Sequence, residues 1–253
     1  MGWLANWRRR RLLREHPLTD ALWQRAIAPY AFLAALDAPE MQRLREMVIV
    51  FLHDKQLHGA AGLLLSDEAR LAIAAQACLP VLNLGLAWYA GWVGIVVYPG
   101  EFKVARQIVD KDGVVHEFND ELSGEAWPDG PVVLSWQDAS QSAPGYNVVI
   151  HEFVHKIHML RGDDDGFPQP HADMDRERWA LAFEAAYARF CGAVERDRPT
   201  RMDAYAAADP AEFFAVASET FFTDAPGLAE EFPAIYRELA AFYRQDPLAR
   251  QVT

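Results

Sequence analysis

The sequence is poor in cysteine and in positive charge. Its 253 residues contain two cysteines, and 24 Lys and Arg stand against 36 Asp and Glu, a formal net charge of −12. Cys78 and Cys191 lie far apart and outside any CxxC motif, which excludes a disulfide scaffold and predicts buried free thiols in a reducing, cytoplasmic compartment. The acidic balance argues against a nucleic-acid partner, because DNA-binding proteins need a basic face. With 51% apolar residues, the composition is typical of a soluble globular protein.

A secretory signal and a membrane span are not expected either. The basic cluster at residues 8–11 lacks the apolar run that follows such a cluster in a signal peptide. Residues 71–100 carry no charge and have the length of a membrane span. Pro80 and several glycines interrupt this stretch, and helix-like LAIAAQACL gives way to β-branched VGIVVYP. We therefore expect a buried helix, a turn region and a core strand there, and no membrane partner.

The apolar pattern predicts an α+β protein with helices before and after a small sheet. We expect one domain over residues 1–253, with a helical layer over about 1–90 and a catalytic part over about 91–253. Asp112-Gly113 indicates a hairpin between two of the strands, so the sheet is expected to be mainly antiparallel. Strands are expected at 93–98, 104–109, 114–118 and 132–136. Helices are expected around Trp23 to Leu33, from Pro39 to Phe51, and at 147–159, 178–196, from Asp209, and within 228–243.

The most informative motif is an HExxH, His151-Glu152-Phe153-Val154-His155, which directly follows the apolar residues 148–150. Residues i and i+4 share one face of a helix, so the two imidazoles can hold one Zn²⁺. Glu152 then stands beside them and can accept a proton from water activated by the metal. The motif predicts a catalytic zinc site on a helix.

A catalytic zinc needs a third protein ligand, and spacing alone leaves it open. His158 lies two helical turns from His151, about 10.5 Å along the axis, so it is expected near the site or at the surface. His158 and Arg161 also replace the Gly and His of the longer HExxHxxGxxH motif, which excludes that subclass. Acidic residues that remain are Glu177, Glu184, Glu195, Glu212 and Glu219. Glu212 also fits a helix-capping role after Asp209-Pro210, and helix geometry permits either Glu212 or Glu219.

Several segments resemble the Mlc titration factor A family of bacterial zinc peptidases. They are VVLSWQDA at 132–139, NVVIHEFVHKIHM at 147–159 and DAYAAADPAEFFAVASETFF at 203–222, with YPGEF at 98–102 and FYRQDP at 242–247. The resemblance covers residues 95–248 and is weaker in the N-terminal helices. It implies a zincin-like metallopeptidase fold, with the HExxH helix and C-terminal helices around the site.

The resemblance also implies roles for individual residues. It gives His151, His155 and Glu212 as the ligands of one Zn²⁺ and Glu152 as the general base, so it overturns the interpretation of Glu212 as a cap alone. The family is similar in its active site to the catalytic domain of anthrax lethal factor, in which a Tyr lies seven positions before a zinc-binding Glu. Tyr205 lies seven positions before Glu212 and is implied to donate to the oxyanion.

Two functions follow from the resemblance. The first is hydrolysis of peptide substrates, of aminopeptidase type, by a cytoplasmic zinc enzyme. The second is binding of a transcriptional repressor of the Mlc type, which relieves repression of sugar-uptake genes. The two are compatible, and the alternative is a mainly non-catalytic repressor-binding protein with a closed or vestigial zinc site. The run at 132–136 is expected to be either a strand whose edge pairs with the substrate or a plain core strand.

Overall fold

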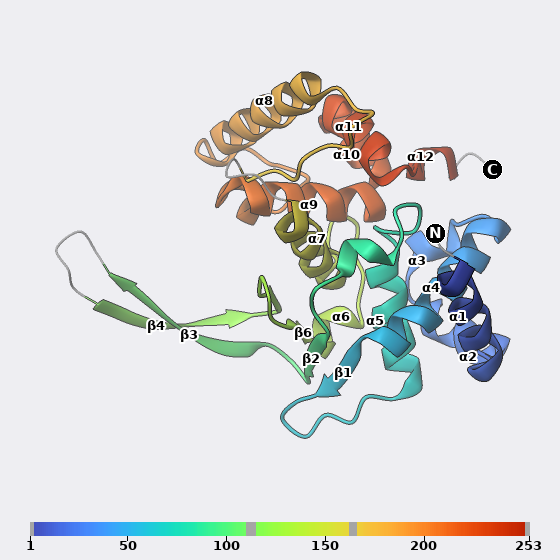
Figure 1. Ribbon diagram of the computed structural model, residues 1–253. Coiled ribbons are helices and arrows are strands. Elements are labelled where there is room, and N and C mark those ends of the chain that lie inside the picture. Colours follow the sequence, from blue (N-terminus) through green and yellow to red (C-terminus); the bar gives the residue numbers. More distant parts are fainter. Residues whose placement is uncertain (1–2, 110–114, 162–165, 251–253) are drawn as a thin grey trace.

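The computed structural model describes residues 3–109, 115–161 and 166–250. Figure 1 shows the N-terminal helices on one side, the C-terminal helices above, a small sheet below and α7 in the middle. The N-terminal helices are α1 (Trp3–Glu15), α2 (Asp20–Ile27), α3 (Ala31–Ala34), α4 (Ala38–Asp54) and α5 (Asp67–Cys78), with the 3-10 turn η1 (Leu86–Tyr89) after them. The later ones are α6 (Trp136–Ala139), α7 (Val148–Arg161), α8 (Arg176–Val194), η2 (Ala204–Ala207), α9 (Pro210–Thr223), α10 (Ala225–Glu231), α11 (Pro233–Tyr243) and α12 (Pro247–Arg250).

Local signals in the sequence explain where the helices begin and end. Asp37 starts α4 with a capping box, in which its side chain accepts from the Glu40 backbone at 2.7 Å and its own backbone N–H donates to the Glu40 carboxylate at 3.3 Å. The helical spacing expected from Trp23 to Leu33 is divided between α2 and α3. Pro29 follows the α2 cap and lacks the N–H that a continuing helix needs, which explains the division.

The central sheet is mixed. Its strand order is β1 (Gln56–Gly59), β2 (Gly94–Tyr98), β6 (Val132–Ser135) and β5 (Gly124–Ala126). The β1·β2 and β2·β6 pairs are parallel and only β5·β6 is antiparallel, so the expectation of a mainly antiparallel sheet is wrong for these four strands. The β1·β2 pair is parallel because α5 connects these two strands as a crossover, and the chain from β2 to β6 passes through β5. Strand β6 ends at Ser135, since Trp136 already begins α6.

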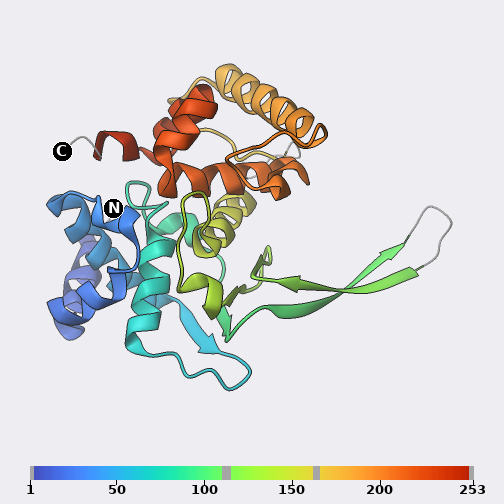
Figure 2. The ribbon, with the colours of Figure 1, turned by 180° about the vertical axis from the view of Figure 1, so that it is seen from behind.

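The predicted hairpin forms a separate two-stranded ribbon. Strands β3 (Phe102–Val109) and β4 (Val115–Leu122) pair antiparallel over their whole length. The expected turn at Asp112-Gly113 lies outside the described residues. Figures 1 and 2 show the ribbon projecting away from the rest of the molecule.

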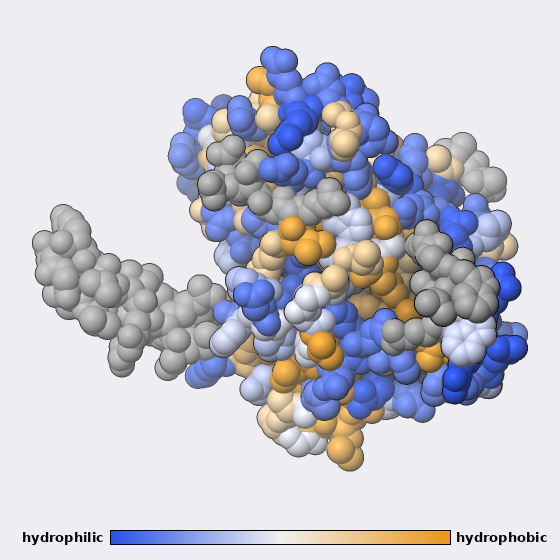
Figure 3. Space-filling model, in the orientation of Figure 1, coloured by the Kyte–Doolittle hydropathy of each residue, from blue (hydrophilic) through white to orange (hydrophobic). Residues whose placement is uncertain are grey.

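Residues 71–100 fold as predicted, into a buried helix, turns and a core strand. Among the described residues, no helix combines the length and the apolar character that crossing a bilayer would require. The face in Figure 3 is mostly hydrophilic, with hydrophobic residues gathered towards the middle and the lower edge. Both cysteines are unpaired; Cys78 is buried as expected, while Cys191 is partly exposed.

Helix α7 joins the N-terminal helices to the rest of the core. Phe153, on its apolar side, is fully buried and lies 5.7 Å from the ring of Phe51, 5.2 Å from that of Tyr89 and 5.7 Å from that of Trp92. These rings come from α4, from η1 and from the loop before β2. The helix that carries the HExxH motif is therefore held by aromatic contacts from the N-terminal part of the chain.

We predict that Phe153→Ala lowers the free energy of unfolding by about 3–5 kcal/mol, because it removes an aromatic side chain from a closely packed core. Urea unfolding followed by circular dichroism measures this change. Leu181→Ala, at a position that is 59% exposed, is the control and should change the free energy by less than about 0.5 kcal/mol. An equal loss in the two variants would contradict the packing role of Phe153.

Candidate metal centre

The packing of α7 against α9 brings the predicted metal ligands together. Asn147 caps α7, since its Oδ1 accepts from the Ile150 N–H at 2.8 Å. Asp209 caps α9 in the same way by accepting from the Glu212 N–H at 2.9 Å, with Pro210 as the first helical residue. His151 thus lies in the first turn of α7, and Glu212 lies in the first turn of α9.

Three side chains converge on one point. His151 Nε2 lies 3.0 Å from His155 Nε2 and 3.0 Å from Glu212 Oε2, and His155 Nε2 lies 3.4 Å from the same oxygen. A tetrahedral ion with bonds of about 2.0–2.1 Å places its ligand atoms about 3.3 Å apart. The three atoms therefore form one face of a tetrahedron of suitable size, and this His-His-Glu group could hold a metal ion.

The chemistry of the three donor atoms supports the same assignment. Two imidazole nitrogens and a carboxylate oxygen face one another, and all three side chains are more than four-fifths buried. Their lone pairs repel unless a proton or a metal cation lies between them. A divalent cation satisfies all three at once and leaves a fourth position open.

Glu219, the other acid that helix spacing permitted as a ligand, contacts a different nitrogen of His151 from Glu212. Its Oε1 lies 2.7 Å from His151 Nδ1, on the side of the ring opposite to Glu212. Glu219 is 3% exposed, so it supports the histidine from behind while Glu212 faces the group of nitrogens. The capping position of Glu212 and its place in the group are compatible, because its backbone N–H makes the cap and its carboxylate makes the site.

The site concentrates coupled charges. Burial opposes the charged form of His151, but the carboxylates of Glu219 and Glu212 outweigh it and raise its pKa well above the usual range. Burial also acts on Glu212, yet hydrogen bonds from both histidines hold its pKa well below the usual range. For the enclosed Glu219, burial dominates and the pKa is raised. The site as a whole therefore favours a cation between the histidines and Glu212.

Glu152 lies beside this group and faces the edge strand β5. It is 5% exposed, and burial raises its pKa to about 7. A Cβ added to Gly124 would lie 2.5 Å from Glu152 Oε1 and 2.8 Å from its Cδ. Only glycine leaves room at this position for the carboxylate of Glu152 as it stands.

Tyr205 and His158 lie at the margins of the site. Tyr205, on η2, is 56% exposed, and its ring centroid is 6.5 Å from that of His151. Asp203 accepts from the Tyr205 N–H at 2.8 Å and fixes the start of η2. His158 lines the same cleft but does not belong to the ligand group, as the helical rise predicts; burial lowers its pKa.

The ligand group opens into a cleft of about 600 Å³ between α7, α9, η2 and β5. Strand β5 forms one wall and is the end strand of the sheet, whereas β6 lies between β2 and β5. Of the two interpretations of residues 132–136, the core strand is therefore confirmed and the substrate-pairing edge is wrong. Strand β5 has only three residues, Gly and Glu among them, and these residues show no strand pattern. The sequence therefore did not indicate this strand.

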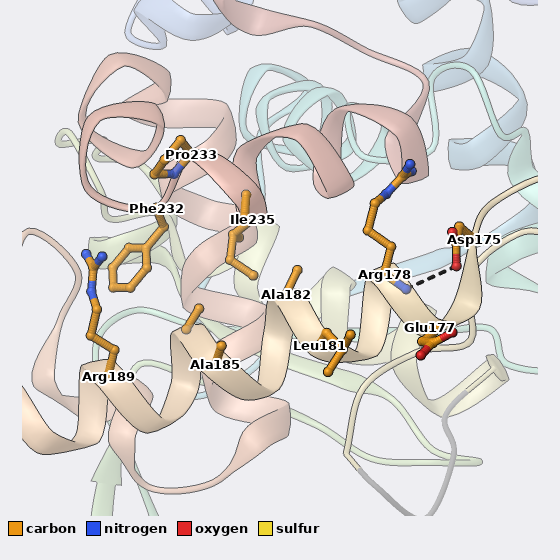
Figure 4. A pocket seen from close by; sticks show the side chains of 12 residues that line it. Asp175, Glu177, Arg178, Leu181, Ala182, Ala185, Arg189, Phe232, Pro233 and Ile235 are labelled. Carbon is orange, nitrogen blue, oxygen red and sulfur yellow. Dashed lines mark hydrogen bonds between the residues drawn. The ribbon is translucent and has the colours of Figure 1, made fainter.

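A second hollow, of about 730 Å³, lies between α8 and α11. Figure 4 shows an apolar floor with Leu181 and Ile235, and charged side chains at its ends. Arg178 forms an ion pair with Glu238 there, at 2.6 Å.

Three of the other acids that the sequence offered as ligands lie outside the cleft. Glu177 lines the second hollow. Glu184 and Glu195, on α8 and at its C-terminal cap, do not line the cleft either. Among the acids that the sequence offered, Glu212 is therefore the one whose carboxylate lies close to both His151 and His155.

Comparison with known proteins gives consistent matches over the whole chain. The profile of a family described as glucose-regulated metallo-peptidase M90 matches residues 4–244. "Mlc titration factor A" of Serratia proteamaculans (strain 568) is 39% identical over 236 residues, 92% of this chain and 90% of the relative. Proteins of the same name from Yersinia pestis (strain Pestoides F) and Yersinia pseudotuberculosis (strain IP 31758) are 39% identical over 235 residues, 91% of this chain and 86% of each relative. These matches confirm the family resemblance and the zincin-like α+β fold predicted from the sequence.

We predict that the purified protein binds one divalent ion per chain and that Glu212→Gln weakens this binding more than 100-fold, beyond the range typical for outer partners of a metal ligand. Elemental analysis after dialysis and competition with a chelator measure the two quantities. Glu184→Gln, on the exposed side of α8, is the matched control and should bind as the wild type does. Unchanged binding in Glu212→Gln would exclude this carboxylate as a ligand.

Proposed function

The chain belongs to the glucose-regulated metallo-peptidase M90 family, and on this premise we propose that it is a zinc-dependent peptidase of aminopeptidase type. The observation that carries the proposal is the convergence of His151, His155 and Glu212 beside the buried carboxylate of Glu152. Two histidines and one carboxylate are a ligand set typical of catalytic zinc. The cleft volume lies in the range of sites for small ligands, which fits short peptide substrates.

The residues around the ligand group supply the acid and base of peptide hydrolysis. A zinc ion, when bound, supplies the Lewis acidity that activates water and polarises a carbonyl. Glu152 accepts the proton of the attacking water and passes it to the leaving amine. A pKa of about 7 suits both transfers, because it lies close to neutral pH. The hydroxyl of Tyr205 donates to the oxyanion that forms on the carbonyl, a role that its exposed position at the cleft allows.

Strand β5 orients the substrate in this proposal. It is the end strand of the sheet and lines the cleft, so its outer edge offers backbone N–H and C=O groups to an extended peptide. Such pairing places the scissile carbonyl of the substrate between Glu152 and Tyr205. Because it uses backbone groups, it depends little on the side chains of the substrate. β5 thereby takes the substrate-pairing role that was one of the two interpretations of residues 132–136.

The second proposed function is binding of a transcriptional repressor of the Mlc type in the cytoplasm. It is supported by the names of the relatives, which are called Mlc titration factor A. Two free cysteines fit a reducing compartment. If repressor binding is the main function, the zinc site is closed or vestigial. If the protein has both functions, binding of the repressor can shift the site between an open and a closed state.

We predict that Glu152→Gln lowers kcat/KM on single-amino-acid anilides by roughly 100- to 10,000-fold, because it removes the general base while keeping the shape of the side chain. Chromophore release with and without a chelator measures activity, and Glu184→Gln is the control. Zinc content and repressor binding should be unchanged in Glu152→Gln. Absence of activity in zinc-loaded wild type would instead favour the non-catalytic repressor-binding function.

We predict that Gly124→Ala lowers kcat about 100-fold without loss of zinc, because the new methyl group displaces the Glu152 carboxylate. Steady-state kinetics on the same anilides and metal analysis measure the effect. Gly94→Ala, on β2 of the same sheet, is the matched control, since its Cβ would meet only Pro131, at 3.4 Å from Cβ and 3.9 Å from Cα. Equal activities in the two variants would show that Gly124 does not set the position of the base.

A further inference from the structure

We propose that Gln76 and Asn147 are positioning residues for the metal centre, which act through Glu219 to fix the tautomer and ring orientation of His151. The inference rests on the proposed function, in which His151 Nε2 binds zinc. It concerns a row of buried polar side chains that runs from α5, through the residue before α7, to α9. None of the roles given above uses Gln76 or the side-chain NH₂ group of Asn147.

Gln76 is an isolated amide in a helix that is otherwise apolar on its buried side. It is 0% exposed, and its Nε2 donates to the backbone oxygens of Ala72 and Ala139, each at 3.1 Å. Both contacts require the NH₂ group, so they fix which end of the amide faces which way. The remaining atom, Oε1, is therefore presented as an acceptor to Asn147.

Asn147 forms hydrogen bonds with residues of α5, α7 and α9. Its Nδ2 donates to Gln76 Oε1 at 2.7 Å, and its Oδ1 accepts from the Ile150 N–H in the first turn of α7. Its own backbone N–H donates to Glu219 Oε2 at 3.3 Å. Because Gln76 offers only an acceptor and Ile150 only a donor, the side chain of Asn147 has one favourable orientation.

Glu219 connects Asn147 to His151, the proposed metal ligand. With one oxygen held by the Asn147 backbone, its other oxygen lies 2.7 Å from His151 Nδ1. A carboxylate there accepts a hydrogen bond, so the proton of the neutral imidazole is on Nδ1 and the lone pair of Nε2 faces the metal position. The plane of the ring is set at the same time.

The alternative is that Gln76 and Asn147 are merely satisfied core residues that stabilise the fold. Tyr30 extends the row, since its hydroxyl donates to the Ala139 oxygen at 2.9 Å, the same atom that accepts from Gln76. A fully connected buried network stabilises a fold whether or not it serves a site. Metal affinity separates the two possibilities, because a merely structural role does not act on the metal ligand.

The experiment uses two variants of the whole chain that break the row at the same contact. Gln76→Leu removes the acceptor with little change of volume, and Asn147→Ser removes the Nδ2 donor while keeping an oxygen that can cap α7. Gln245→Leu is the matched control: Gln245 is also buried, at 4% exposure, and its Nε2 donates to the Leu79 oxygen at 2.8 Å. Zinc dissociation constants come from chelator competition, and the absorption spectrum of the Co²⁺-loaded proteins reports the ligand geometry.

We expect Gln76→Leu and Asn147→Ser each to raise the zinc dissociation constant about tenfold and to change the Co²⁺ spectrum. Gln245→Leu should lower Tm to a similar extent and leave both unchanged. Wild-type affinity in the two variants, or an equal loss in Gln245→Leu, would overturn the inference and leave the proposed zinc site standing. A wild type that binds no zinc would overturn both. Should Asn147→Ser fail to fold, Gln76→Leu alone gives the answer.

Discussion

The contact between α7 and α9 is the constraint on which the rest of the site depends. Every residue from Phe213 to Phe222 is buried, so α9 has almost no freedom to rotate or slide within the core. Its two carboxylates are placed by that packing: Glu212 at the partly buried beginning of the helix and Glu219 two turns further on. Helix α7 is held from its other side by the aromatic rings around Phe153. The distances among the ligand atoms are thus a result of core packing rather than of local loops.

This packing encloses more negative charge than the protein could retain without compensation. Glu152, Glu212 and Glu219 all lie within the same small region, and two of them are almost fully buried. Unpaired buried carboxylates are costly, so their charge must be offset by the two histidines or by a bound cation. The same arrangement separates the roles of the acids, because Glu212 is held ionised while burial raises the pKa of Glu152 to about 7.

The sequence was sufficient to predict the elements whose residues show a strong hydrophobic period or a specific motif spacing. The helix of the HExxH motif, the helix after Asp209-Pro210 and the antiparallel ribbon were all predicted from such signals. Helix spacing alone left the choice between Glu212 and Glu219 open, because both lie on one helix face, and it was the family resemblance that selected Glu212. Strands β1 and β5 were missed, since four and three residues with glycine among them give no alternation. Parallel pairing was missed as well: β1 was not predicted, and the pattern of β2 and β6, although both strands were predicted, does not show which strands pair.

The aromatic contacts of Phe153 also bear on how the chain is divided. A boundary near residue 90 separates a mostly helical segment from the part with the HExxH motif. Phe51 and Tyr89, which precede this boundary, nevertheless pack directly against Phe153 on α7. The core is therefore continuous across that boundary, which favours the prediction of a single domain. The helices before residue 90 form the inner wall of the part with the HExxH motif, so a chimaera that joins the two parts from different relatives would have to preserve these aromatic contacts.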